Sequence, residues 1–184
     1  TWKSYLTYQL LDSRASHLNA AIDETSFAFH GAVLSGRTEQ RPRSKRGVRL
    51  LNRVLGEALG KLYVADYFPP EAKSRMKGLV QNVLDTFDGN IDKLDWMSAT
   101  TRKAAKAKLA TFTAKIGYPD VWRDYSPLVI KRGDHMGNMM RSYAFEHQKE
   151  MNKLGKKVDR DEWFMSPQTV NAYYDPTKNE IVFP

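Results

Sequence analysis

The residues best suited to metal or acid–base chemistry in this sequence are its four histidines, His17, His30, His135 and His147. Two imidazoles can share a zinc ion when they lie four residues apart on a helix, as in H-E-x-x-H, and no pair here has that spacing. His147 and Glu150 lie three residues apart, but they supply two ligands where zinc needs three or four. His147 also falls on an apolar helical stripe, which favours a hydrogen-bonded core histidine over a metal ligand.

A cluster of carboxylates, formed by Asp159, Asp161 and Glu162, is the next candidate for chemistry. Its spacing does not match the EF-hand loop, in which the calcium ligands occupy fixed positions of a twelve-residue segment. The pattern is therefore more typical of a capped helix or a solvated turn than of a calcium or acid–base site. The glycines form neither G-x-G-x-x-G nor G-x-x-x-x-G-K-[ST], so the sequence predicts no phosphate-binding loop.

Basic residues gather in two places, and a net charge of +8 raises the question of an anionic partner. Lysine and arginine clusters can neutralise phosphates, but no aromatic residues interleave with these and no nucleic-acid-binding motif accompanies them. A solvated basic surface is the favoured interpretation. The alternative function kept open is a non-catalytic helical module that binds through this surface, with nucleic acid as the possible partner. The residues concerned are Arg37, Arg41, Arg43, Lys45, Arg46 and Arg49, and then Arg102, Lys103, Lys106 and Lys108.

Composition places the chain among folded globular proteins, with 184 residues of which 41% are hydrophobic and 27% charged. There is no cysteine, which excludes disulfides, thiolate metal sites and a cysteine nucleophile. No apolar run approaches the roughly 18 residues of a membrane-spanning helix. The first residues, TWKSYLTYQLLD, do not resemble a signal peptide.

Helical periodicity dominates the first 157 residues. A helix that is broken or bent once is predicted from Trp2 to about Leu34, followed by a basic loop over residues 37–47. A second helix is predicted from Val48 to about Tyr67. A third is predicted to start at the Pro69–Pro70 pair, because proline suits the first helical turn. Its inward face is predicted to contain Met76, Leu79, Val83 and Phe87.

Two further helices follow in the predicted helical region. Ser98 is the expected N-cap of a helix whose buried stripe extends as far as Ile116, with Gly117 expected at the left-handed C′ position. The segment from Asp120 to Asp134 is less regular. The last helix is predicted to end at Gly155, and its apolar face is expected to contain Met136, Met140, Tyr143, His147, Met151 and Leu154.

The period then changes from helical to alternating in VNAYY and NEIVFP, which flank the turn-forming segment DPTKN. These residues predict a β-hairpin over 170–184, with Pro176 fixing one turn angle. A hairpin of this size is only marginally stable by itself in water. The fold class is therefore mainly α with a short C-terminal β-hairpin, and the hairpin is expected to be poorly anchored or to pair with another molecule.

Three blocks in order resemble the neprilysin-type zinc metallopeptidases: LGEALGKLYVADYF, LDWMSATTRKAAKAKLATFTAKIGYPD and VDRDEWFMSPQTVNAYYDPTKNEIVFP. The resemblance implies a two-lobed, mostly helical fold with a thermolysin-like catalytic lobe. It makes residues 1–157 a helical domain and residues 158–184 the start of that catalytic lobe. Animal members carry a cysteine near the position of Gly47, and its absence here favours a bacterial member.

The same resemblance implies a zinc cofactor for a parent endopeptidase that hydrolyses peptides. In the family the H-E-x-x-H helix lies C-terminal to the I-V-F-P strand, so this chain is expected to hold no zinc and no catalytic residue. Asn171, Ala172 and Tyr173 are expected to bind the peptide substrate at an edge strand, whereas Tyr174 is expected to pack in the core. A degenerate, non-catalytic member is a further possibility.

The resemblance also bears on partners and location. The expected partners are a peptide substrate and the remaining catalytic lobe of the same protein, and no nucleic acid is expected. Export to the periplasm or cell surface is implied by the family alone.

Overall fold

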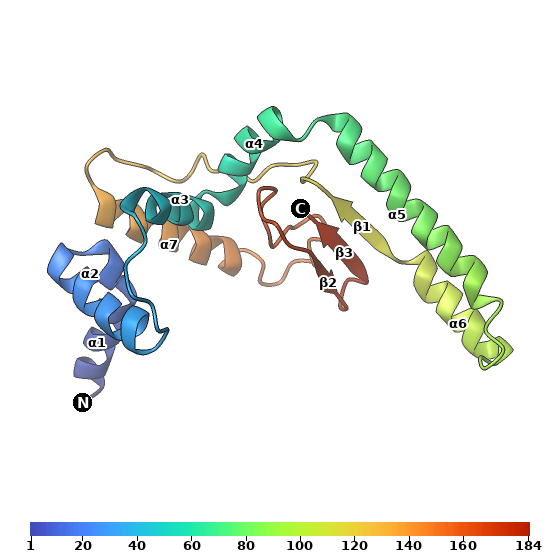
Figure 1. Ribbon diagram of the computed structural model, residues 1–184, viewed down its shortest axis with the longest axis horizontal. Coiled ribbons are helices and arrows are strands. Elements are labelled where there is room, and N and C mark those ends of the chain that lie inside the picture. The colour runs from blue at the N-terminus through green and yellow to red at the C-terminus, as the bar shows by residue number, and fades with distance from the viewer. The chain divides into compact units, whose positions relative to one another are not determined.

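The computed structural model describes residues 1–184, and the chain divides into two compact units. The first unit contains Thr1–Leu50 and Tyr125–Lys157, and the second contains Leu51–Asp124 and Val158–Pro184. Each unit is therefore built from two separate stretches of sequence. Figure 1 labels seven α-helices and three strands: α1 (Trp2–Arg14), α2 (Ala20–Ser26), α3 (Arg43–Val54), α4 (Gly56–Tyr67), α5 (Pro70–Ile91), α6 (Ala99–Ala110), β1 (Thr113–Ile116), α7 (His135–Met151), β2 (Tyr173–Asp175) and β3 (Glu180–Phe183).

The helical N-terminal region is confirmed, and its break lies between α1 and α2. A 3-10 turn over Ala15–His17 follows α1, and α2 begins where the Asn19 side chain accepts a hydrogen bond from the Ile22 amide at 3.1 Å. A π-helical stretch, Phe27–Val33, continues α2. None of the helices in the chain is long and apolar enough to cross a bilayer.

The prediction of a basic loop over residues 37–47 is wrong in its second half, because α3 already begins at Arg43. The Pro42 carbonyl accepts a hydrogen bond from the Arg46 amide at 3.1 Å, so proline opens this helix instead of interrupting it. The single helix predicted from Val48 to Tyr67 is also wrong. Leu55 has φ −132° and ψ 34°, which separates α3 from α4.

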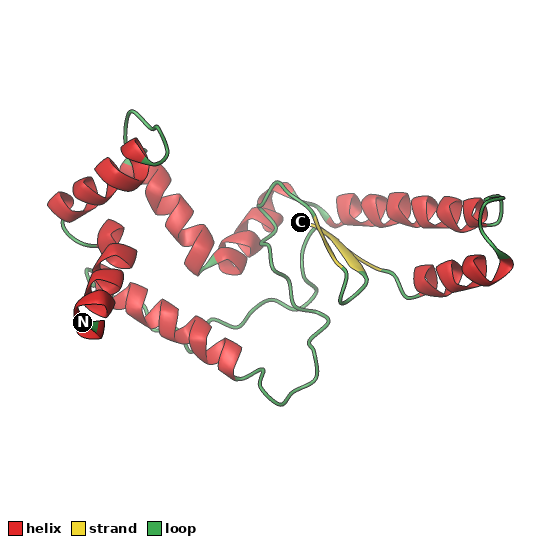
Figure 2. Cartoon of the chain, turned by 90° about the horizontal axis from the view of Figure 1, so that it is seen from below, coloured by secondary structure: helices red, strands yellow, loops and turns green.

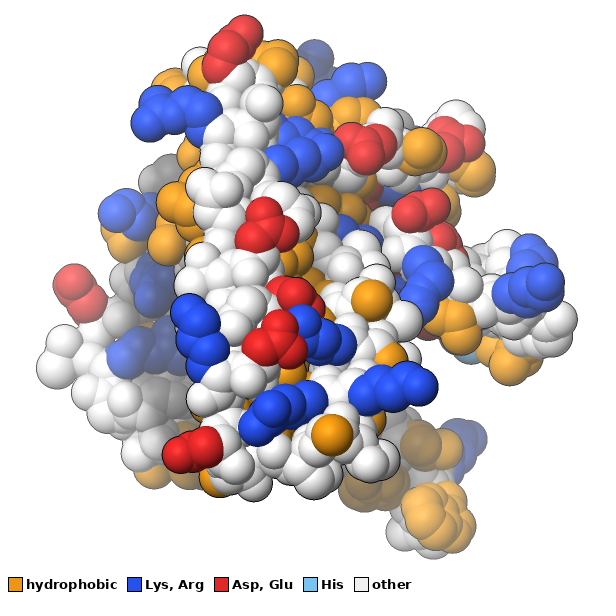
Figure 3. All heavy atoms as spheres, turned by 90° about the vertical axis from the view of Figure 1, so that its right-hand side faces the viewer, with side chains coloured by type: hydrophobic (Ala, Val, Ile, Leu, Met, Phe, Trp, Pro, Cys, Tyr) orange, Lys and Arg blue, Asp and Glu red, His pale blue; other side chains and the backbone are white.

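In the second unit, α5 and α6 lie side by side and run in opposite directions (Figures 1 and 2). Lys106 of α6 joins them through ion pairs with Asp88 at 3.1 Å and Asp92 at 2.7 Å. At this end of the molecule, charges of both signs are interspersed among apolar side chains (Figure 3). The predicted inward face of α5 is exposed instead, with Phe87 61% accessible, because no element of this chain covers it.

The start of α6 is confirmed as predicted, since the Ser98 hydroxyl oxygen accepts a hydrogen bond from the Thr101 amide at 3.1 Å. Replacing Ser98 with alanine leaves that amide without its partner, so we expect the free energy of unfolding to fall by about 1 kcal/mol. Urea denaturation measures the difference. Ser98→Asp restores an acceptor at the same position and should recover most of the loss. Equal stability of the alanine and aspartate variants would contradict the cap.

The end of α6 differs from the prediction. The helix stops at Ala110, and Thr113–Ile116 form β1 where the sequence had predicted continued helix. β1 pairs in parallel with β3, with Thr113 opposite Glu180 and Ile116 opposite Phe183. β2 pairs with the other side of β3 in antiparallel orientation, so the strand order is β1-β3-β2. The expectation of a poorly anchored hairpin is therefore wrong, because β1 gives β3 a partner within this chain.

The last predicted helix is confirmed as α7 in the first unit, with Asp134 as its N-cap and Gly155 in the left-handed region beyond its end. The predicted apolar stripe is only partly buried. Met139 and Ser142 are the fully buried positions, whereas His147 is exposed, which overturns its interpretation as a core histidine. The helix is amphipathic in a different register from the predicted one.

Candidate functional site

The predicted peptide-binding residues lie at one border of the small sheet in the second unit. Asn171 and Ala172 are exposed and immediately precede β2, while Tyr173 is its first residue and is half-buried. β2 has β3 on one side and no strand on the other. The structure thus places all three residues along an open strand edge.

The hydrogen-bonding pattern shows which main-chain groups face outward from this edge. Two amides of the β1 segment bond to β3, that of Thr113 to the Asn179 carbonyl at 3.0 Å and that of Gly117 to the Phe183 carbonyl at 2.6 Å. Main-chain groups alternate along a strand, so Glu180 and Val182 direct theirs toward β2. Their register partners are Asp175 and Tyr173.

The main-chain groups of Tyr173 and Asp175 face β3, so those of the alternate residue, Tyr174, face the other way. Ala172, which immediately precedes β2, is the next alternate position. The N–H and C=O groups of Tyr174 therefore point away from the sheet, and we expect the same direction for those of Ala172. The Ala172 amide donates to no strand carbonyl and instead donates to the side-chain oxygen of Asn171 at 2.8 Å. This arrangement leaves the edge able to pair with an extended peptide.

Tyr173 packs beneath the sheet rather than standing free. Its hydroxyl oxygen accepts a hydrogen bond from the Phe164 amide at 3.2 Å, and the two rings lie 6.0 Å apart. Burial raises the pKa of the Tyr173 hydroxyl, so the phenol stays protonated at neutral pH. A role for its ring in a side-chain subsite remains a prediction.

Tyr174 does not occupy the core position predicted for it, since its side chain is 43% exposed. Its ring stacks on that of Phe112 at a centroid distance of 6.4 Å. Its hydroxyl also forms a hydrogen bond with the Asn179 side-chain oxygen at 3.0 Å. Tyr174 therefore supports the outer face of the hairpin.

The predicted turn between the strands is confirmed. One carboxylate oxygen of Asp175 accepts hydrogen bonds from the Thr177 hydroxyl at 2.6 Å and from the Thr177 amide at 2.9 Å. The Thr177 hydroxyl is the main cause of a lowered pKa at Asp175. Asn179 has φ 51°, the left-handed conformation that asparagine tolerates better than most residues. The turn fixes the register that exposes Ala172.

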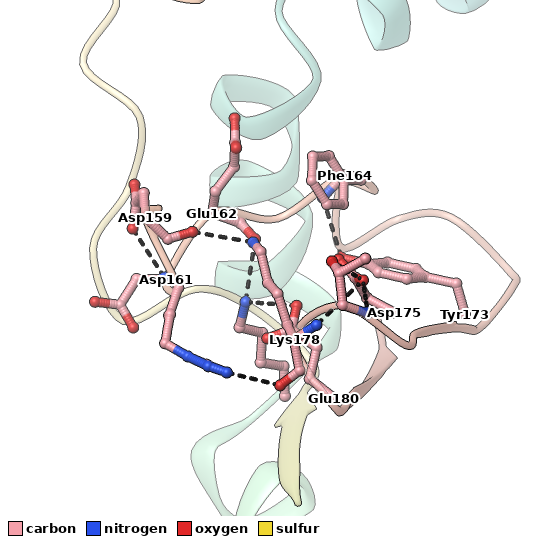
Figure 4. A network of polar contacts seen from close by, with 11 residues as sticks. Asp159, Asp161, Glu162, Phe164, Tyr173, Asp175, Lys178 and Glu180 are labelled. Atoms are coloured by element: carbon pink, nitrogen blue, oxygen red, sulfur yellow. Dashed lines mark hydrogen bonds and ion pairs between the residues drawn. The ribbon is translucent and has the colours of Figure 1, made fainter. Parts of the chain in front are cut away.

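A polar network beneath the sheet holds the hairpin in place (Figure 4). Glu180 is 1% exposed and forms an ion pair with Lys115 at 3.0 Å. The Lys115 ammonium also donates to the Glu162 carbonyl at 3.1 Å, and Lys178 donates to the Asp159 carbonyl at 3.0 Å. Two lysines thus attach the segment before the hairpin to the sheet.

The carboxylate cluster in this segment forms a turn, as predicted. The Asp159 carboxylate accepts a hydrogen bond from the Asp161 amide at 2.8 Å, and Arg160 donates to the Lys178 carbonyl at 2.8 Å. The main-chain carbonyls of this cluster, rather than its carboxylates, accept the hydrogen bonds from Lys115 and Lys178 that attach it to the sheet. The cluster provides structural support for the candidate site.

Sequence reasoning missed Lys115 and Glu180, the buried charges that connect β1 to β3. A signal was present in Thr111, Phe112 and Thr113, because two β-branched residues flanking an aromatic residue favour a strand over a helix. The alternating pattern of NEIVFP did predict a strand around Glu180. Nothing local indicated that its carboxylate would be buried against a lysine 65 residues earlier.

The histidines do not assemble into a metal site. His17 and His135 meet in the first unit, with their ring nitrogens 3.3 Å apart. His30 bonds to the Asp12 carboxylate at 2.9 Å. No group of three or more His, Cys, Asp and Glu side chains in the chain is arranged to hold a metal ion. The residues present therefore do not fit a zinc site, and no catalytic step is assigned to them.

Comparison with known proteins identifies the family. The model of peptidase family M13, in its N-terminal part, matches residues 1–119. The chain belongs to peptidase family M13. The predicted resemblance to neprilysin-type metallopeptidases is thereby confirmed. Residues 120–184, which lie beyond the family model, are aligned in the individual relatives described next.

Curated M13 relatives align with nearly the whole chain. The endothelin-converting enzyme homolog of Locusta migratoria is 31% identical over 98% of this chain and 26% of its own length. Human neprilysin is 30% identical over 99% of this chain and 25% of its own length. The M13 chain described here therefore spans about a quarter of these relatives.

Solved bacterial structures share its fold throughout, hairpin included. The zinc metalloprotease Zmp1 of Mycobacterium tuberculosis, in complex with an inhibitor, is 51% identical with a TM-score of 0.91, over 100% of this chain and 27% of that one. PepO from Lactobacillus rhamnosis is 28% identical with a TM-score of 0.90, over 100% of this chain and 29% of that one. These matches agree with the bacterial character predicted from the missing cysteine.

Proposed function

We propose that this M13 chain is a segment of a zinc metalloendopeptidase that hydrolyses peptides, and that its β2 border holds the substrate in extended form. The observation that carries the proposal is the open edge of β2, with Asn171 and Ala172 exposed beside it. The activity named for the relatives supports the reaction class. The zinc ion and the groups that act on water would be supplied by the remainder of the same protein.

Peptide binding at this edge uses main-chain hydrogen bonds, which depend little on substrate sequence. The Asn171 side chain occupies the Ala172 amide at 2.8 Å when no peptide is present. An incoming peptide carbonyl would replace that oxygen and free the Asn171 amide group to contact the peptide backbone. Asn171 thus both protects the edge and contributes to binding.

The mechanism assigned to this chain is therefore positioning. An extended substrate held by several main-chain hydrogen bonds has its scissile bond fixed relative to the sheet, which removes much of the entropic cost of reaching the reactive geometry. Turn residue Asp175 and the buried Lys115–Glu180 pair keep the edge rigid. Export to the periplasm or cell surface stays a prediction of the family resemblance.

The test uses the full-length protein and measures steady-state hydrolysis of a short peptide. Asn171→Ala and Ala172→Pro should each reduce kcat/KM about fivefold, because a lost hydrogen bond is worth about 1 kcal/mol, and Ala172→Pro should have the larger effect because proline removes the edge amide itself. The loss is expected mainly in KM, with bound zinc unchanged. Val170→Ala, at a fully exposed neighbouring position, is the control. Unchanged KM in both variants would refute the assignment of the edge.

The alternative of a basic nucleic-acid-binding module gains no supporting observation. Arg46 is paired with Asp23 at 2.6 Å, and Arg102 donates to the Leu94 carbonyl at 2.7 Å. Lys106 is held by the two aspartates of α5 described above. Several of the basic side chains therefore already have partners within the chain, and the peptidase proposal is the one developed further.

A further inference from the structure

A second open strand edge lies on the opposite border of the sheet from β2. The amides of Thr113 and Gly117 point toward β3, so alternation along the strand directs the main-chain groups of Ala114 and Ile116 away from it. The Ile116 carbonyl accepts a hydrogen bond from the Tyr118 amide at 3.0 Å. The N–H and C=O of Ala114 and the N–H of Ile116 remain directed outward.

A pocket of about 360 Å³ lies along this edge. Every residue of β1 lines it, together with Lys73 and Lys77 of α5 and Arg160 and Trp163 of the segment before the hairpin. The volume falls within the range of ligand-binding clefts. Because the pocket follows the strand edge, it can accommodate an extended main chain together with one of its side chains.

The charges around the pocket differ in how far they are already neutralised. Lys73 is buried and donates to the Asp120 carboxylate and to the Tyr118 carbonyl, each at 2.8 Å. The hydrogen bond from Lys73 lowers the pKa of Asp120, so the Asp120 carboxylate is ionised at neutral pH. Lys115 is likewise committed to Glu180.

The charges at the mouth of the pocket are less neutralised. Lys77 and Arg160 are exposed and line the pocket; neither forms a direct ion pair, although the charge of Lys77 helps to lower the pKa of Asp120 and Arg160 donates to the Lys178 carbonyl. Asp161 is the exposed carboxylate beside them, and it has no cation partner. The lining contains four cations, Lys73, Lys77, Lys115 and Arg160, and three anions, Asp120, Asp161 and Glu180, so the pocket has a surplus of one positive charge.

We propose that the β1 edge is a second peptide-binding site, which takes an extended acidic segment as an added strand. The main chain of that segment would pair with Ala114, and a glutamate or aspartate side chain would enter the pocket mouth between Lys77 and Arg160. This binding needs no residue of β2 and does not rest on the substrate proposal. The two borders of one sheet then hold two different peptides.

Fluorescence anisotropy with the full-length protein tests this proposal. The probe is a short labelled peptide of alternating glutamate and valine, compared with its lysine–valine counterpart. Lys77→Glu should weaken binding of the acidic probe at least about tenfold, and Ala114→Pro should do the same by removing an outward amide. Because the Ala114 amide faces away from β3, proline there leaves the sheet's own hydrogen bonds intact.

Two matched variants locate the binding. Lys103→Glu makes the same charge change on exposed α6 and should not alter binding of the acidic probe. Ala172→Pro makes the same backbone change on β2; it should remove only the binding that does not depend on charge and should leave the preference for the acidic probe intact. Circular dichroism checks that Ala114→Pro is folded. If the variant is not folded, the parent protein is tested instead with an acidic probe that is methylated on alternate amides. This methylated probe should bind about tenfold more weakly than the unmethylated one. Undetectable binding at millimolar probe, equal binding of the lysine–valine peptide, or loss through Ala172→Pro and not Lys77→Glu would each overturn the proposal.

Discussion

Replacing Lys115 with alanine should lower the free energy of unfolding by about 3–5 kcal/mol, because it leaves the Glu180 carboxylate buried without its cation. Glu180 is 1% exposed on the central strand, and its oxygen lies 3.0 Å from the Lys115 ammonium. The same substitution removes the hydrogen bond from Lys115 to the Glu162 carbonyl. Urea denaturation, followed by intrinsic tryptophan fluorescence, measures the loss.

The appropriate comparison removes both charges at once. Lys115→Met with Glu180→Leu keeps the approximate volume and leaves no buried charge, so we expect its stability to be close to that of the parent chain. Lys106→Ala breaks an exposed pair in the same unit and should have little effect. If Lys115→Ala were no more destabilising than Lys106→Ala, the buried pair would not contribute as described.

Replacing Gly117 with valine should cost about 3 kcal/mol, since it combines left-handed strain with overpacking. Gly117 has φ +78°, and a Cβ atom there would lie 2.6 Å from Cε1 of Phe68. The Phe68 ring is held in turn by an edge-to-face contact with Tyr118 at 5.9 Å. We therefore expect little room for relief, and thermal or urea denaturation measures the cost.

Gly155 provides a matched control for the steric part of this prediction. It has φ +71°, and a Cβ atom there would meet nothing within 4 Å. Gly155→Val should therefore show the backbone strain alone, at about 1–2 kcal/mol. Adding Phe68→Ala to Gly117→Val should make the glycine substitution itself less costly. Equal losses at Gly117 and Gly155 would show that contact with Phe68 carries no penalty.

The features that the sequence predicted correctly depend on residues a few positions apart. Ser98 caps α6 through an amide three residues later, Pro70 opens α5, and Asp175 builds the turn through Thr177. The spacing of such residues is visible in a sequence, because donor and acceptor belong to the same turn. The hairpin followed from the same kind of local signal, whereas the substrate-binding role of Asn171 and Ala172 came from the family resemblance and stays a prediction.

The features that were predicted wrongly depend on distant partners. β1 is a strand because β3, more than sixty residues later, pairs with it, and the preceding helical period gave no indication of that. The apolar stripe of α5 predicted a buried face, yet periodicity identifies the stripe without supplying the element that covers it. The burial of Glu180 likewise depends on Lys115.

The division of each unit into two stretches of sequence has a consequence for synthesis of the protein. The ribosome completes residues 1–50 before the second unit begins, and completes 51–124 before the first unit is finished. Neither unit has all its parts until residue 157 has emerged, and β1 waits for β3 until residue 183. The nascent chain must therefore carry two unfinished units at once, and neither can close its core until its second stretch of sequence has been synthesised.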